Sequence, residues 1–268
     1  MILVIKIGGR VMGDALSEEA LTDLETVTHR TPTVLVHGGG NTVSSIAEKL
    51  GVPQKFVTSP EGFRSRYTDA ETIQIYTMVM AGKVNKQIVT QLTAKKIPAI
   101  GLSGLDGGLI RAQRKKQLIV KDERGRRRII DGGYTGLVTH ADSALLQTLI
   151  GAGYVPIIAP IAVGEENEPL NIDGDRTAAA VATAVKAETL MLVTDVPGVN
   201  LSSGVSRNLS ADEAKKNLRN LGPGMITKIY AALEAISGGV PRVLVAPGTG
   251  PTPYTTALNG QAGTLITP

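Results

Sequence analysis

The chain has 268 residues, of which 28 are Lys or Arg and 24 are Asp or Glu, so its formal charge at pH 7 is only +4. With 42% hydrophobic residues it can bury a large core, and the lack of any cysteine excludes disulfide scaffolds, thiolate metal sites, iron–sulfur clusters and thiol nucleophiles. No run of about 18 uncharged apolar residues is available to span a membrane, and we expect a cytoplasmic protein without a signal peptide.

Short apolar runs alternate with amphipathic stretches along the chain. The runs have five or six residues, as do strands that are buried on both faces of a parallel sheet. Predicted strands cover 2–7, 33–37, 98–102, 155–160, 189–194 and 242–246. Predicted helices cover 16–28, 42–50, 69–81, 84–95, 141–150, 176–187 and 225–237, and a capping box of Ser210 and Glu213 begins one more. This alternation predicts a three-layer αβα sandwich with a mainly parallel, open sheet, whose ligands bind at the carboxyl ends of the strands.

The segment 111–131 interrupts the alternation and carries most of the positive charge. It contains nine basic and three acidic residues, a net charge of +6, which leaves −2 for the rest of the chain. Residues 117–121 and 127–130 are strand-like and flank Asp-Glu-Arg-Gly, a composition typical of a hairpin turn. We therefore expect a basic β-hairpin that projects from the sheet. Its charge serves either solubility alone or the attraction of an acidic partner.

Glycine-rich turns follow the first two predicted strands. Lys6-Ile7-Gly8-Gly9 ends the first strand, and His37-Gly38-Gly39-Gly40-Asn41 ends the second. Glycines at such turns let backbone N–H groups approach an anion, and the helix that follows adds its dipole. The alternative is that they only make tight turns, and neither matches a Walker loop or G-x-G-x-x-G. Lys6 favours the anion site, because a lysine at the end of a buried strand is costly unless it meets an anion.

Six motifs in chain order carry a resemblance to a known family: K-I-G-G, V-H-G-G-G-N, G-F-R-S-R, N-I-D-G-D, T-D-V-P-G-V and G-P-G-M-x-x-K. Together they resemble the amino acid kinase family, in particular its acetylglutamate kinase branch. The resemblance implies an N-terminal lobe, 1–165, for acyl substrate binding and dimerisation, and a C-terminal lobe, 166–268, for ATP. It also implies ATP-dependent phosphorylation of a side-chain carboxylate, with Mg²⁺ bridging the phosphates and no side chain assigned to the metal.

The resemblance assigns roles to residues in each motif. Lys6 and Lys228 reach the transferring phosphoryl group from its two sides, and Asp175 orients both lysines. Such a transfer depends on positioning and charge neutralisation, and a carboxylate nucleophile needs no base because it is ionised at pH 7. His37 is expected only to pack or to form hydrogen bonds. The substrate-binding residues that the resemblance implies are Gly39, Gly40, Arg64 and Asn171, and the nucleotide-binding residues are Gly8, Gly9, Thr194, Asp195, Gly198, Gly224 and Met225.

Two departures from the branch bear on the substrate. The G-F-R-S-R motif has a second arginine, Arg66, and the segment 111–128 is strongly basic. Both features resemble the lysine-biosynthesis members, which phosphorylate 2-aminoadipate held through its amino group on an acidic, LysW-type carrier protein. Whether carrier-bound glutamate is used as well, for arginine biosynthesis, stays open. We expect a homodimer, and carrier docking through Arg114, Lys115, Lys116, Arg126, Arg127 and Arg128.

Two other functions stay open. One is acetylglutamate kinase acting on free N-acetyl-L-glutamate in arginine biosynthesis. The other is a nucleic-acid-binding or regulatory module, since arginine clusters also bind phosphates. The segment 111–131 has no aromatic residue to stack on bases, and a regulatory module would be expected to have lost Lys6 or Lys228. We therefore expect neither nucleic-acid nor membrane binding.

Overall fold

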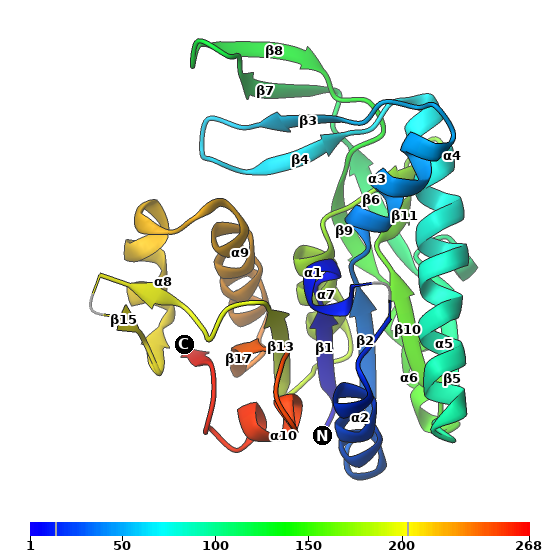
Figure 1. Ribbon diagram of the computed structural model, residues 1–268, viewed down its shortest axis with the longest axis vertical. Helices are drawn as coiled ribbons and strands as arrows, with labels where there is room; N and C mark the ends of the chain where they lie inside the picture. The colour runs from blue at the N-terminus through cyan, green and yellow to red at the C-terminus, as the bar shows by residue number, and fades with distance from the viewer. Residues whose placement is uncertain (14, 203) are drawn as a thin grey trace.

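The computed structural model describes residues 1–13, 15–202 and 204–268, and an eight-stranded sheet lies at its centre (Figure 1). Its strands are β1 (Leu3–Ile7), β2 (Thr33–His37), β5 (Ala99–Ser103), β10 (Val155–Ala159), β13 (Thr189–Thr194), β16 (Asn208–Ser210), β17 (Arg242–Pro247) and β18 (Thr264–Thr267). They follow the order β16-β18-β17-β13-β1-β2-β10-β5. All neighbours are parallel except β17 and β18. The six predicted strands are therefore all in this sheet.

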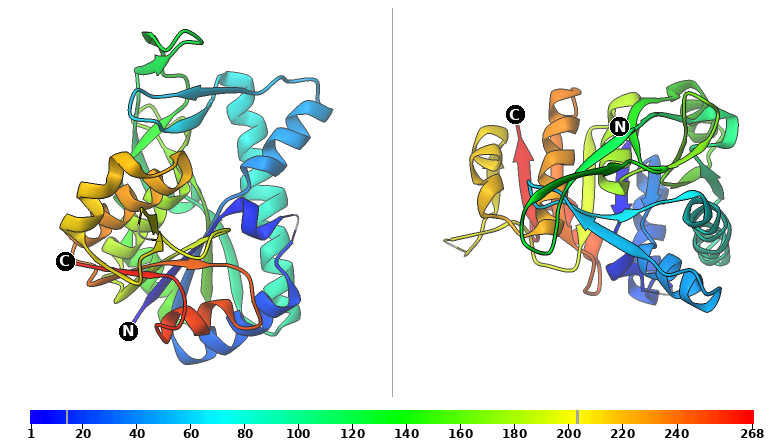
Figure 2. Two further views of the ribbon diagram at one scale, coloured as in Figure 1. Left: turned by 60° about the vertical axis from the view of Figure 1, so that its left-hand side comes forward. Right: turned by 90° about the horizontal axis from the view of Figure 1, so that it is seen from above.

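Helices cover both faces of the sheet, which confirms the αβα sandwich (Figures 1 and 2). One face packs against α1 (Gly9–Met12), α2 (Glu18–Arg30), α3 (Gly40–Lys49), α4 (Ala70–Thr77), α5 (Asn85–Ala94) and α10 (Pro253–Leu258). The other packs against α6 (Ser143–Gly151), α7 (Gly174–Ala184), α8 (Ala211–Asn217) and α9 (Pro223–Ser237). Within the described residues, no helix has the length and apolar character needed to cross a membrane.

Each central strand contributes side chains to both apolar layers, as β1 illustrates. Leu3, Ile5 and Ile7 belong to the core beneath α2 and α5. Val4 belongs to the core beneath α7 and α9. Because successive side chains of a strand point to opposite faces, Lys6 lies on the same face as Val4. The strand therefore directs its only charged side chain toward α7 and α9.

A second, four-stranded sheet and three hairpins complete the fold. The sheet has the order β12-β11-β6-β9 and comprises β6 (Ile110–Arg114), β9 (Gly136–Ala141), β11 (Ile161–Val163) and β12 (Pro169–Asn171). The hairpins pair β3 (Lys55–Thr58) with β4 (Arg64–Tyr67), β7 (Gln117–Lys121) with β8 (Arg127–Asp131), and β14 (Asn200–Leu201) with β15 (Gly204–Val205). The β7–β8 hairpin projects from one end of the molecule (Figure 1), so the predicted basic hairpin is confirmed.

The break predicted between two helices is absent, and the lobe boundary is not tested by the structure. The helices predicted at 69–81 and 84–95 are joined without a break, because α4 runs into α5 through a π-helical segment, η1 (Met78–Val84). The lobe boundary expected at residue 165 falls in the turn between β11 and β12. The central sheet is continuous across the two lobes, since β1 pairs with β13 along its whole length. The division of work between the lobes stays a prediction.

Candidate active site

The turns after β1 and β2 lie against one another at the carboxyl ends of the two strands. The strands are parallel neighbours, with Ile7 opposite His37. A Cβ on Gly38 would lie 2.6 Å from the backbone N of Gly9, and a Cβ on Gly9 would lie 2.9 Å from the backbone N of Gly39. Only glycine permits this approach. The two predicted turns are thereby brought together beside the start of α3, an arrangement suited to anions.

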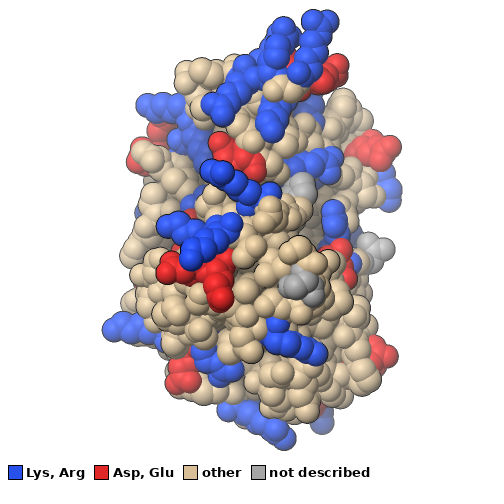
Figure 3. Space-filling view, turned by 90° about the vertical axis from the view of Figure 1, so that its left-hand side faces the viewer, with Lys and Arg blue, Asp and Glu red and all other residues tan. Residues whose placement is uncertain are grey.

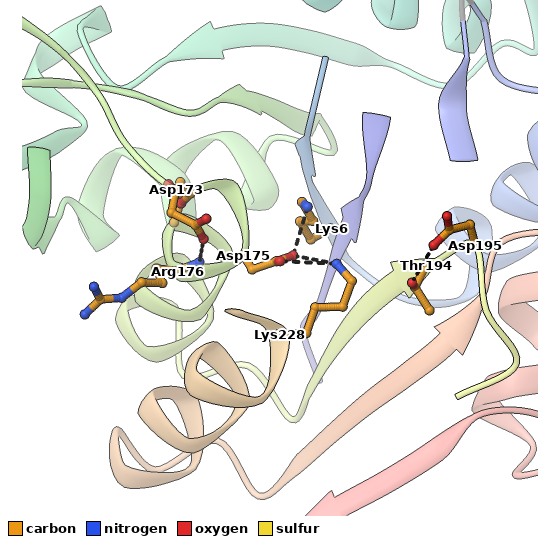
Figure 4. Close-up of polar contacts among 8 residues, drawn as sticks. Lys6, Asp173, Asp175, Arg176, Thr194, Asp195 and Lys228 are labelled. Atoms are coloured by element: carbon orange, nitrogen blue, oxygen red, sulfur yellow. Dashed lines mark hydrogen bonds and ion pairs between the residues drawn. The ribbon is translucent and has the colours of Figure 1, made fainter. Parts of the chain in front are cut away.

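Lys6, Asp175 and Lys228 meet on the face of the sheet covered by α7 and α9 (Figure 4). Nζ of Lys6 lies 2.8 Å from Oδ1 of Asp175. Nζ of Lys228 lies 3.1 Å and 3.2 Å from the two carboxylate oxygens of Asp175. All three side chains are buried. The structure thus brings together the three residues to which the resemblance assigns catalytic roles.

The start of α7 explains how Asp175 reaches this point. Asp173 caps the helix, since its Oδ1 accepts a hydrogen bond of 2.9 Å from the backbone N–H of Arg176. Asp175 then lies in the first helical turn. There the positive end of the helix dipole favours a carboxylate. The capping residue and the dipole therefore hold a buried negative charge that Lys6 and Lys228 can approach from two other elements.

Burial and mutual attraction shift the pKa of each group in this cluster. Burial alone would raise the pKa of Asp175 above 3.8. The charges of Lys6 and Lys228 have the larger combined effect and lower the pKa to about 2. Burial also disfavours the charged form of Lys6, yet Asp175 and Asp173 outweigh it and raise the pKa of Lys6. The pKa of Lys228 is lowered, because burial and the charge of Lys6 prevail over Asp175. Asp175 is therefore ionised at neutral pH and holds two basic groups at one point.

Asp173 is a second carboxylate beside this cluster, and it borders the cleft described below. The residue is exposed to solvent within the cleft. Partial loss of hydration there and the neighbouring charge of Asp175 raise the pKa of Asp173. The site therefore contains two aspartates whose pKa values are driven in opposite directions.

A cleft of about 790 Å³ opens beside Lys6 and collects the residues assigned to the substrate. The end of β12 supplies Asn171, whose side-chain amide donates a hydrogen bond of 2.9 Å to Oγ1 of Thr68. The β3–β4 and β7–β8 hairpins contribute further walls. Among the residues assigned from the sequence, those that line the cleft are Lys6, Gly9, Gly39, Gly40, Arg64, Lys115 and Asn171.

Two arginines of β4 occupy different environments although both lie against Phe56. Arg64 is exposed to solvent, and its guanidinium lies 4.5 Å from the centre of the Phe56 ring. Arg66 is buried, and its Nη2 donates hydrogen bonds to the carbonyl of Gly40 at 2.7 Å and to Ser44 Oγ at 2.9 Å. Arg66 therefore holds the second glycine turn in place. Its role was not assigned from the sequence, where the only signal was a second arginine in the motif.

Two residues assigned to the nucleotide, Thr194 and Asp195, lie on the opposite side of Lys228 from Asp173 (Figure 4). Thr194 ends β13 and donates a hydrogen bond of 3.2 Å to Oδ1 of Asp195 (Figure 4). A Cβ on Gly198 would lie 2.7 Å from Oγ1 of Thr264, so this glycine is needed for close packing. Of the nucleotide set, Gly9 lines the cleft beside Lys6 together with the substrate residues, and the residues that do not line it are Gly8, Thr194, Asp195, Gly198, Gly224 and Met225. The binding of nucleotide by this set stays a prediction.

The basic residues expected to dock a carrier fall into two groups. The first group is not part of the β7–β8 hairpin: Arg114 ends β6, where it lies over the ring of Tyr134, and Lys115 is half-buried in the cleft. The second group lies on the hairpin, where Arg126 and Arg128 both approach Asp122. The expected single basic patch is therefore divided, because Arg114 to Lys116 connect the second sheet to the hairpin.

His37 has the structural role expected of it. Its Nδ1 lies 2.8 Å from the carbonyl of Gly38, and its Nε2 lies 3.2 Å from the side-chain amide nitrogen of Asn85. Burial lowers the pKa of His37 to about 4, so the ring is neutral at pH 7. Asn85 also donates to the carbonyls of Leu102 and Ile157. It therefore ties β2, β5 and β10 to α5, a function that sequence reasoning missed.

Two lysines held by one buried carboxylate, beside paired glycine turns at the strand ends of an αβα sandwich, define a phosphotransferase. Charge neutralisation on both sides of a transferring phosphoryl group needs this type of arrangement. The chain belongs to the amino acid kinase family, whose sequences match residues 1–247. Members of this family are ATP-dependent kinases.

Full-length relatives and solved structures agree with this membership. The chain is 47% identical over 264 residues to the putative [LysW]-aminoadipate/[LysW]-glutamate kinase of Cenarchaeum symbiosum, covering 98% of each chain. It is 47% identical over 265 residues to the [LysW]-aminoadipate/[LysW]-glutamate kinase of Metallosphaera sedula, covering 98% of this chain and 99% of that one. A Streptococcus mutans protein structure is 26% identical with a TM-score of 0.80, covering 99% and 98%. The structure of carbamate kinase from Giardia lamblia is 15% identical with a TM-score of 0.70, and the match covers 99% of this chain and 98% of that one. At this identity the likeness shows a common fold.

Proposed function

We propose that this chain transfers the γ-phosphoryl group of ATP to the side-chain carboxylate of 2-aminoadipate, and of glutamate, carried on a LysW-type protein. The observation that carries this proposal is the buried Lys6–Asp175–Lys228 cluster beside the glycine turns and the cleft. The names of the full-length relatives support the choice of substrate. The basic hairpin at the cleft supports a substrate borne by an acidic protein.

The proposed reaction needs positioned charges and no protein nucleophile. A side-chain carboxylate oxygen bonds to the γ-phosphorus while the bond from that phosphorus to the β–γ bridging oxygen breaks, giving an acyl phosphate and ADP. No proton moves, since the carboxylate is ionised at pH 7. In this proposal Lys6 neutralises charge from the acceptor side and Lys228 from the nucleotide side, and Asp175 keeps both ammonium groups in place.

Backbone and side-chain donors would position the two substrates. Gly39 and Gly40 would hold the attacking carboxylate, and Gly8 and Gly9 the phosphates, through the approach that their turns allow. Arg64, exposed at the cleft, would grip the α-carboxylate with two hydrogen bonds, and Asn171 the amino-acid portion. The nucleotide would lie against the set Gly8, Gly9, Thr194, Asp195, Gly198, Gly224 and Met225.

Mg²⁺ fits this site as an ion that enters with ATP. Over residues 1–13, 15–202 and 204–268, no group of three or more His, Cys, Asp or Glu side chains is placed to hold a metal ion. Mg²⁺ prefers phosphate and water oxygens and binds through few protein ligands. Held on the phosphates, it would neutralise charge on the transferring group.

We also propose that the lobes 1–165 and 166–268 bind acyl substrate and ATP respectively, and that the protein is a homodimer.

The test of this function compares acceptors. ADP release is measured with LysW bearing 2-aminoadipate, with LysW bearing glutamate and with free N-acetyl-L-glutamate, and the acyl phosphate is trapped with hydroxylamine. We expect kcat/KM for a LysW-borne acceptor to exceed that of the free compound about 100-fold or more, because charge attraction speeds encounter with the carrier. Equal or better turnover of N-acetyl-L-glutamate would instead identify an acetylglutamate kinase.

A further inference from the structure

The β7–β8 hairpin exposes an apolar pair on one of its faces. Ile119 and Ile129 lie directly opposite each other in the ladder, and they are 54% and 66% exposed. The other face contains Val120, which is only 7% exposed. Because side chains alternate along a strand, one face of the hairpin is packed and the face bearing the two isoleucines is open. A pair of large aliphatic side chains facing solvent on a projecting hairpin costs stability and solubility unless a partner covers it.

Two basic side chains lie beside this pair, on the side of the hairpin turn. Lys121 and Arg127 are opposite each other, one step beyond the isoleucines on the same face. Neither forms an ion pair with a described residue, whereas Arg126 and Arg128 both approach Asp122. Glu61 lies near enough for both charges to lower its pKa, and this single carboxylate offsets two bases only in part. Lys121 and Arg127 therefore present a net positive charge next to an apolar surface. That combination is complementary to an acidic surface with an apolar side chain.

The open face also lies beside the cleft. The wall of the cleft includes Ile119 and its neighbours on β7, and it extends to Lys6 and Gly39. The hairpin stands at one end of the molecule in Figure 1 and in the left-hand view of Figure 2. Lys and Arg side chains gather at that end in the space-filling view (Figure 3). A macromolecule seated on the hairpin could therefore place a chain terminus in the cleft.

We propose that Ile119, Ile129, Lys121 and Arg127, together called the hairpin seat, dock the folded body of an acidic carrier protein. The proposal rests on the function given above, and it assigns the affinity for the carrier to the apolar pair. Lys121 and Arg127 steer the carrier by long-range attraction, which mainly sets the rate of encounter. Burial of the two isoleucines by an apolar side chain of the carrier then slows its release, because interface energy concentrates in a few desolvated apolar contacts.

The test replaces the apolar pair and leaves every charge in place. Ile119→Thr/Ile129→Thr keeps β-branched residues in the strands, so the hairpin is retained. With LysW bearing 2-aminoadipate, we expect the KM for the carrier to rise about tenfold or more, with kcat and the KM for ATP within about twofold of wild type. Leu50→Thr is the matched control, since Leu50 is 58% exposed at the far end of α3 from Gly40, and it should leave all three constants unchanged.

A second variant separates steering from affinity. Lys121→Gln/Arg127→Gln should raise the KM for the carrier at low salt and flatten its salt dependence, whereas the isoleucine variant should keep the wild-type salt dependence. Hydrogen exchange on the wild-type protein should show that the carrier protects the amides of β7 and β8 and leaves those of β14 and β15 unprotected. Unprotected β7 and β8 amides would overturn the hairpin seat whatever the variants do.

The failure of this proposal is distinguishable from the failure of the proposed function. If the wild-type protein phosphorylates the carrier-borne acceptor but the isoleucine variant has a wild-type KM, the hairpin seat is wrong and the function stands. If the wild-type protein does not phosphorylate it, the function and the seat both fall. A change in molecular mass by light scattering, with no change in KM, would assign the isoleucines to contact between copies of this chain and overturn the carrier seat.

Discussion

Two aspartates of this chain each hold two basic side chains, one inside the molecule and one on the β7–β8 hairpin. Asp175 lies between Lys6 and Lys228, and the three side chains are 7%, 10% and 11% exposed. Asp122 lies between Arg126 and Arg128, and those arginines are 59% and 65% exposed. The distances are similar, at 2.8 and 3.1 Å in the first group and 2.9 and 3.6 Å in the second.

The difference in burial changes what the same arrangement does. Away from water, each charge depends on its partners, so the loss of one partner leaves the others uncompensated. Such a site also interacts strongly with an anion that enters it, because little solvent screens the attraction. On the hairpin, water and salt screen every pair, and the arginines stay available to other charges. The buried group is therefore suited to chemistry, and the exposed group to adjustable attraction.

The largest effect is expected from removing one base of the buried group. Lys228→Met retains the length and apolar part of the side chain but removes the ammonium group. We expect kcat to fall by about 10³-fold or more, because a charge that stabilises the transferring phosphoryl group in a dry site is lost. Single-turnover kinetics at saturating ATP measure the chemical step. Lys216→Met, in exposed α8, is the matched control, and a near wild-type kcat for Lys228→Met would remove this lysine from the mechanism.

The next effect concerns the carboxylate itself and depends on pH. Lys6 and Lys228 hold the pKa of Asp175 at about 2, below its ordinary 3.8, despite its burial. Because the pKa is lower in the folded state than in the unfolded state, ionised Asp175 adds about 2 kcal/mol to the free energy of unfolding above about pH 4. This contribution is lost as the pH falls toward about 2. Asp175→Asn should therefore flatten the fall of the urea midpoint between pH 5 and pH 3, and it should lower kcat about 100-fold. An unchanged slope would show that the pKa of Asp175 does not differ between the folded and unfolded protein.

Six of the eight strands of the central sheet were predictable because each is an apolar run of five or six residues, whereas β16 and β18 were missed because they are short and at most half apolar. β2 and β13 have the predicted bounds, since each is an apolar run that ends at a turn or a polar residue. β3 and β4 were missed because Lys-Phe-Val-Thr and Arg-Ser-Arg-Tyr have no apolar run, being partly exposed on both faces. In the second sheet, β11 and β12 have only three residues each, and β6 and β9 contain charged or polar residues that interrupt the apolar pattern.

The candidate site was predictable where a motif places a residue at the end of an element. Lys6 lies at the end of a strand beside glycines and Asp175 at the start of a helix, and the resemblance supplied the role of each. The contact of Lys228 with Asp175 depends on how α9 packs against α7, which no local pattern encodes. The same holds for the contact of Arg66 with Gly40, because side-chain partners far apart in the sequence are determined by the whole fold.

The smallest effect is expected at Asp122, and its sign should be opposite to that at Asp175. In Asp122→Asn the side-chain oxygen can still accept the backbone N–H bonds of Arg124 and Arg126 that close the turn, at 3.0 and 2.9 Å. Only the charge is lost, which frees Arg126 and Arg128 from their shared partner. The KM for the carrier should therefore fall by about twofold at low salt and should return to the wild-type value as salt is raised.

The matched control for this last substitution is Asp142→Asn, because Asp142 caps α6 through its side-chain oxygen in the same way and lies outside the hairpin. It should leave the KM for the carrier unchanged at every salt concentration. A rise in KM for Asp122→Asn would mean that the ion pairs hold the arginines in the orientation that the carrier needs. Asp122 would then position its bases as Asp175 is proposed to do, and exposure alone would not separate the two groups.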